Sequence, residues 1–149
     1  MNQRTAVAVG VAVVASGAMI ALLGAPWYEA TTQLESGSRP FVIEANAWTP
    51  LTTSDIAIAV LAGLGGLLSY AGYASRRSIP SLPLAALCAL AATGIVLYRV
   101  VEPPGGGGYT PPASQKVDVL WGAWLTLGSG AVLMIAPLVA LQSTRRRIS

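Results

Sequence analysis

Charged residues are spaced so that four long stretches of this chain carry no ionised side chain. The stretches hold 24 residues between Arg4 and Glu29, 20 between Asp55 and Arg76, 21 between Arg77 and Arg99, and 26 between Asp118 and Arg145. A helix needs about 20 apolar residues to cross a bilayer, so each stretch can cross once but not twice. The chain is also only 10% charged, whereas soluble domains carry about 25% charged residues. The sequence therefore predicts an all-α membrane protein with four transmembrane helices.

We expect a single membrane domain over residues 1–149, divided by these stretches. The predicted helices cover residues 6–25, 55–75, 81–101 and 118–141, which leaves loops at 26–54, 76–80 and 102–117. The short loop makes the second and third helices antiparallel neighbours, so the pattern favours an up-down bundle. The first stretch could instead be a signal peptide, but it exceeds the usual apolar core of about 7–15 residues, which favours a retained helix.

Most basic residues and all acidic residues fall at opposite ends of this predicted bundle. Six basic residues fall in the termini and the 76–80 loop, whereas all 6 acids fall on the other side together with Arg39, Arg99 and Lys116. The six basic residues are Arg4, Arg76, Arg77, Arg145, Arg146 and Arg147. Because basic residues concentrate in cytoplasmic segments, we expect a multi-pass protein of the cytoplasmic (inner) membrane with both termini in the cytoplasm, N-in/C-in.

Two groups of side chains are interpreted as membrane anchors. The arginines at 76, 77 and 145–147 are expected to contact anionic headgroups or, alternatively, a cytoplasmic partner. Nucleic-acid binding is not favoured, since the last cluster is three residues long and has no aromatic neighbours for base stacking. Aromatic rings prefer the membrane interface, and on the outer side we expect them there at Trp27, Tyr28, Trp48, Trp121 and Trp124.

The first outer loop has the pattern of a β-hairpin. Residues 27–34 and 41–48 are rich in aromatic, β-branched and threonine side chains, and Gly37 and Pro40 lie in the turn region between them. We expect two paired strands that rest on the helix ends, because a lone hairpin is only marginally stable. The second outer loop contains Pro-Pro pairs and four consecutive glycines at 105–108, which predict a flexible linker without strand or helix.

Small residues recur at four-residue spacing in each predicted helix. Such faces let helix backbones approach closely in lipid, where no hydrophobic force drives association. We interpret them as packing surfaces inside the bundle, with association between subunits as the alternative. The residues are Ala8, Ala12, Ser16, Ala59, Ala62, Gly63, Gly66, Ala85, Ala89, Thr93, Gly122, Thr126 and Gly130.

Asp55 and Arg99 lie at helix ends that the up-down order brings together. Glu102 follows Arg99 by three residues, which is the spacing of helical neighbours. We predict that Arg99 pairs with Asp55, Glu102 or both, as a structural ion pair that fixes the helix ends. A substrate or proton site is the alternative interpretation.

Several short strings resemble those of small four-helix membrane proteins that are widespread in actinobacteria. They are APWYE after the first predicted helix, the lone Trp48, Asp55 at the start of the second helix, LYRVVEPP at 97–104 and GAWLTLGSG at 122–130. The resemblance covers nearly the whole chain. It implies a tetraspan fold and a high-alanine source, and it implies no activity.

The residue types present argue against most catalytic chemistry. The chain has no histidine and a single cysteine, Cys88, so it lacks the commonest general base and cannot form an internal disulfide. We therefore expect no enzyme activity, no cofactor and no metal site.

The favoured hypothesis is a non-catalytic accessory or scaffold subunit, or a small homo-oligomer, with the bilayer, other membrane subunits or itself as partner. A small transporter or channel subunit is the alternative, in which Gly63, Gly65 and Gly66 would allow a break in the second helix. A membrane enzyme that uses Glu29, Glu44 and Asp55 is the third and least favoured hypothesis.

Overall fold

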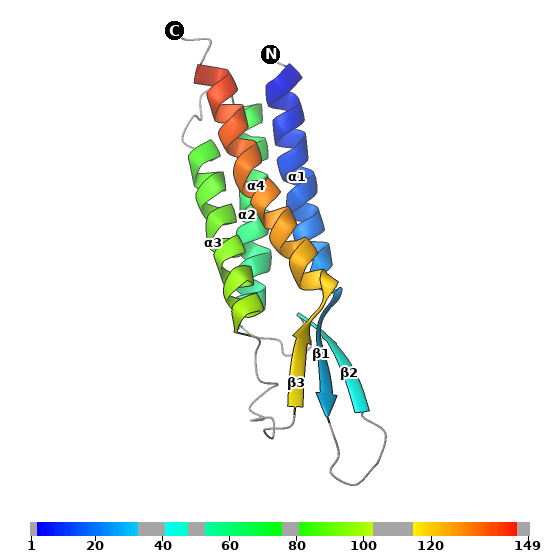
Figure 1. Cartoon of the computed structure of the whole chain (residues 1–149). Helices are drawn as coiled ribbons and strands as arrows, with labels where there is room; N and C mark the ends of the chain where they lie inside the picture. Colours follow the sequence, from blue (N-terminus) through cyan, green and yellow to red (C-terminus); the bar gives the residue numbers. More distant parts are fainter. Residues whose placement is uncertain (1–2, 33–40, 48–52, 76–80, 103–114, 146–149) are drawn as a thin grey trace.

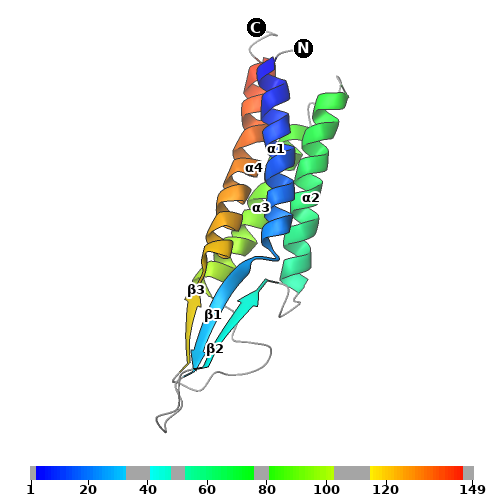
Figure 2. The same cartoon turned by 90° about the vertical axis from the view of Figure 1, so that its right-hand side faces the viewer.

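A computed structural model of the chain describes residues 3–32, 41–47, 53–75, 81–102 and 115–145. Within these residues, four α-helices lie side by side and three short strands form a sheet at one end of them (Figure 1). We call this the sheet end of the bundle. Successive helices run in opposite directions, and α1 begins and α4 finishes at the end away from the sheet (Figures 1 and 2).

The helices have the length and composition of membrane spans. They are α1 (Gln3–Leu22), α2 (Thr53–Ala74), α3 (Ser81–Val101) and α4 (Trp121–Arg145). Each of these four described helices is long and apolar enough to cross a membrane, which confirms that part of the prediction. Many large apolar side chains point away from the bundle, among them Val14 of α1 and Leu67 of α2, which are 72% and 67% exposed. A bilayer would cover such side chains.

Both boundaries of the first helix and both boundaries of the fourth differ from the prediction by three or four residues. The first helix ends at Leu22 rather than residue 25, because short-range backbone hydrogen bonds turn the chain at residues 23–25, just before a strand that begins at Pro26. The fourth helix begins at Trp121 rather than residue 118, and it continues to Arg145 with Pro137 inside it. Uncharged stretches limit where a helix can lie, but they do not mark its first residue.

The sheet has the strand order β2-β1-β3, and both pairings are antiparallel. Its strands are β1 (Pro26–Thr32), β2 (Phe41–Asn46) and β3 (Gln115–Val119). The pairing of β1 with β2 confirms the predicted hairpin strands, whereas the predicted turn at residues 33–40 lies outside the described residues.

The third strand was not predicted, and the expectation that residues 102–117 contain no strand is wrong. Residues 115–119 pair along the free edge of β1, and the backbone N–H of Leu120 donates to the carbonyl of Trp27 at 2.7 Å. The β-branched Val117 and Val119 suit this position, whereas the prolines and glycines come earlier, at 103–112. Those earlier residues lie outside the described part of the chain.

Small residues fill the contacts between the helices, as the sequence predicted. Of the small residues in the predicted set, three are only half-buried, namely Ala59, Gly63 and Thr93. The buried members of the predicted set are Ala8, Ala12, Ser16, Ala62, Gly66, Ala85, Ala89, Gly122, Thr126 and Gly130. Between α1 and α2, the Ser16 hydroxyl donates to the carbonyl of Ala62 at 2.8 Å. The four-residue spacing thus marks packing inside the bundle.

Gly66→Ala is expected to lower the free energy of unfolding by about 1–3 kcal/mol, the usual cost of overpacking a core. A Cβ at Gly66 would lie 2.6 Å from the Ser16 Oγ and 2.8 Å from its Cβ, so one helix must shift. Gly94→Ala is the control, because no atom lies within 4 Å of its added Cβ. Unfolding of both variants in detergent by circular dichroism provides the measurement. Equal stability of the two variants would contradict close packing of α1 on α2.

Candidate functional site

A buried ion pair joins α2 to α3 at the sheet end of the bundle. The Arg99 Nη2 lies 2.9 Å from both Oδ1 and Oδ2 of Asp55. Asp55 is fully buried and Arg99 is 5% exposed. The predicted contact between these two residues is therefore present.

Helix ends favour this arrangement of charges. Asp55 lies in the first turn of α2, and Arg99 lies in the last turn of α3. A carboxylate is stabilised near the positive end of a helix dipole and a guanidinium near the negative end. Since α2 and α3 are antiparallel neighbours, these two ends meet and each charge also faces its partner.

Glu102 occupies a more exposed position than the two residues of the pair. It follows directly after α3, and its carboxylate accepts a hydrogen bond from the hydroxyl of Tyr98. Tyr98 itself is 61% exposed, so this contact lies on the outside of the bundle. The buried charge of Arg99 is balanced by Asp55.

Trp27 and Tyr28 connect the sheet to the ion pair. The Tyr28 hydroxyl donates to the backbone carbonyl of Arg99 at 3.1 Å, and the Trp27 Nε1 donates to the carbonyl of Leu22 at 2.8 Å. The two rings meet edge to face, with centroids 6.1 Å apart. A contact between β1 and the end of α3 therefore supports the residue that carries the buried positive charge.

Trp27 and Tyr28, two of the predicted interfacial aromatics, lie inside the protein rather than on its outer surface. Trp27 is fully buried and Tyr28 is 5% exposed, because β1 begins directly below the helix ends and its first side chains pack among them. Trp121 and Trp124 are more than half exposed, as an interfacial aromatic must be. Trp48 lies outside the described residues.

Burial raises the pKa of Tyr28 to about 12, and the nearby Asp55 carboxylate acts in the same direction, whereas Arg99 opposes it. Both effects that raise the pKa disfavour the ionised phenolate. The hydroxyl is therefore protonated at neutral pH, where it can donate to the Arg99 carbonyl.

This shift predicts a loss of stability at high pH. A group whose pKa is raised on folding contributes fully below its unfolded value of about 10, and its contribution is lost as pH rises through about 12. Melting temperatures of wild type and Tyr28→Phe should therefore converge between pH 10 and 12. Tyr70→Phe is the control, because the Tyr70 ring is 59% exposed. A constant difference between wild type and Tyr28→Phe across this range would contradict burial of the hydroxyl.

Three acidic residues form a row across the sheet. The register pairs Glu29 of β1 with Glu44 of β2 on one side and with Asp118 of β3 on the other. Directly opposed residues of antiparallel strands point to the same face, so the three carboxylates share one face of the sheet. Within the described residues, no group of three or more histidine, cysteine or acidic side chains is arranged to hold a metal ion. The acids named in the enzyme hypothesis are thus divided, with Asp55 in the ion pair and the other two on the sheet.

Most of the predicted arginine anchors lie outside the part of the chain that the structure describes. Arg145 is the last residue of α4, and its side chain is outside the described set. Arg76, Arg77, Arg146 and Arg147 also lie outside the described residues. Sequence reasoning missed the supporting role of Tyr28, for which the sequence has no local signal, since its partner is 71 residues away.

Comparisons with known proteins give no assignment: no protein-family model matches the chain, and no curated protein matches its sequence. The resemblance to actinobacterial four-helix proteins remains a prediction.

Proposed function

We propose that this chain is a non-catalytic accessory or scaffold protein of the cytoplasmic membrane, whose helix bundle presents the small sheet to a membrane partner or to a second copy. The observation that carries this proposal is the buried connection between sheet and bundle through Tyr28, Arg99 and Asp55. A sheet fixed in this way keeps one orientation relative to the helices, which is what a docking surface requires.

The polar side chains within the described spans support a packing role rather than a transport path. Ser69, Thr93, Thr126 and Ser129 each donate to a backbone carbonyl four residues earlier in their own helix. Transporters commonly place unwound backbone or ionisable groups near the middle of the membrane. Here α2 is continuous from Thr53 to Ala74, including its glycines.

The proposed orientation has the sheet outside the cell and both termini in the cytoplasm. The acids at the sheet end include Glu29, Glu44 and Asp118 on the strands, whereas Arg4 lies in the first turn of α1 at the other end. This distribution supports the orientation because basic residues favour the cytoplasmic side.

A labelling experiment tests the orientation in whole cells. In a Cys88→Ser background, Glu44→Cys should react with a membrane-impermeant maleimide in intact cells. Ser149→Cys should react only after the membrane is permeabilised. The reverse pattern would contradict the proposed orientation.

Site-specific photocrosslinking tests the docking role. A photoreactive amino acid at Val42, which is 50% exposed on β2, should yield a discrete protein adduct in native membranes. The control position is Leu67, which is 67% exposed on the outer surface of α2 and should give mainly lipid adducts. If both positions crosslink only to lipid, the proposal is wrong.

A further inference from the structure

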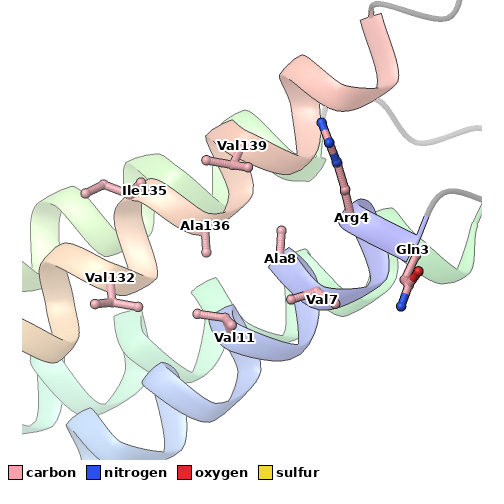
Figure 3. A pocket seen from close by; sticks show the side chains of 9 residues that line it. All are labelled: Gln3, Arg4, Val7, Ala8, Val11, Val132, Ile135, Ala136 and Val139. Atoms are coloured by element: carbon pink, nitrogen blue, oxygen red, sulfur yellow. The ribbon is translucent and has the colours of Figure 1, made fainter.

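A continuous apolar groove runs along the outside of the bundle between α1 and α4. It consists of two adjoining hollows of about 550 and 740 Å³, which share Val7, Val11 and Val132. Figure 3 shows the hollow farther from the sheet, where side chains of α1 and α4 face each other across the opening.

The depth of the groove comes from missing side chains. Gly10 of α1 and Gly128 of α4 both line the hollow nearer the sheet, and a Cβ at either position would meet no atom within 4 Å. These glycines therefore do not serve close helix contact in this structure. They leave a surface trough bordered by Val11, Val14 and Val132.

The two ends of the groove differ in chemistry. The end away from the sheet carries Gln3 and Arg4, whereas the rest of the lining is almost entirely apolar. Arg4 extends from the first turn of α1 toward α4 (Figure 3). A hydrogen bond of 2.8 Å between the hydroxyls of Thr5 and Ser143 holds the two helices together at this end.

We propose that this groove binds one acyl chain of an anionic phospholipid, whose phosphate contacts Arg4. The shape and the single charged end fit an amphiphile with a long apolar tail and a negative head. Basic pockets at the membrane surface between helices bind anionic headgroups, and the positive end of the α1 dipole adds to the attraction. This inference requires the chain to span a membrane but does not depend on the proposed partner of the sheet.

Selectivity must come from the headgroup. Lipid tails are as apolar as the valines that line the groove, so a tail alone gains little by leaving the bilayer for it. A basic residue near the surface attracts anionic lipid by about 1 kcal/mol, which corresponds to about a fivefold change in affinity. The acyl tail and the headgroup charge therefore make separable contributions to lipid binding.

Native mass spectrometry of the full chain in detergent tests the proposal, with phosphatidylglycerol and phosphatidylcholine of identical acyl chains as probes. Wild type should bind phosphatidylglycerol at least about fivefold more tightly. Arg4→Gln should lower that preference about fivefold, and Arg4→Lys should keep it. Equal binding of the two lipids to wild type, or a preference that is unchanged in Arg4→Gln, would overturn the proposal.

Filling the groove with a larger side chain tests whether the acyl tail of the lipid occupies it. Gly128→Leu should weaken binding of both lipids, whereas Gly94→Leu, on α3 and equally free of neighbours, should leave binding unchanged. Melting curves of both variants establish that they are folded. A folded Gly128→Leu variant that binds lipid like wild type, or that converts a dimer to a monomer without a change in lipid binding, would contradict the proposed occupant.

Discussion

Arg99→Ala is expected to lower the free energy of unfolding by about 3–5 kcal/mol, the cost of removing one partner from a buried ion pair. Asp55 has no solvent exposure, so its carboxylate would lose the guanidinium that lies 2.9 Å from both of its oxygens. Chemical unfolding of the purified protein in detergent, followed by circular dichroism, measures the loss. Most natural domains are stable by only about 5–15 kcal/mol, so the variant should also accumulate poorly in cells.

Double variants show whether the loss comes from the pair itself. Asp55→Leu combined with Arg99→Met should recover most of the stability lost in Arg99→Ala, because a buried pair can be replaced by apolar residues of similar size at little cost. The charge swap of Asp55→Arg with Arg99→Asp should recover less, since each reversed charge then opposes its helix dipole. A charge swap that is no more stable than Asp55→Arg alone or Arg99→Asp alone would show that the two residues do not interact.

The helices and the ion pair could be predicted because charge is costly in lipid. Ionised side chains therefore mark the limits of each span, and α2 and α3 differ from the predicted spans by no more than two residues. Once the helix order was fixed, Asp55 and Arg99 had to lie at neighbouring ends. Both predictions follow from a one-dimensional property of the chain, namely the distance between charges.

The features that the sequence did not predict depend on partners that are remote along the chain. The strand at 115–119 exists because β1 offers a free edge, and β1 ends more than 80 residues earlier. The burial of Trp27 has the same origin, because residues near a helix end are exposed unless another element covers them. The groove between α1 and α4 combines Gly10 with Gly128, and neither glycine alone indicates a hollow.

Trp27→Ala is expected to cost about 3–5 kcal/mol in the free energy of unfolding, as for other buried aromatic residues. The Trp27 side chain is among the largest fully buried groups in the described residues, and it fills the space between β1 and the helix ends. Its loss would leave a cavity in the hydrophobic cluster that also contains Met19 and Leu23. We expect the variant to lose order first in the sheet, which limited proteolysis of the purified protein in detergent can detect.

Two further variants separate the causes of this loss. Trp124→Ala removes the same side chain from a position that is 55% exposed, so its effect should stay within about 0.5 kcal/mol. Trp27→Phe retains most of the apolar volume but removes the Nε1 donor to Leu22, so its cost should be intermediate. That carbonyl also accepts a hydrogen bond from the Ala25 backbone at 3.1 Å, which limits the polar part of the loss. Equal effects of Trp27→Ala and Trp124→Ala would mean that Trp27 faces the membrane surface and does not help to hold the sheet on the bundle.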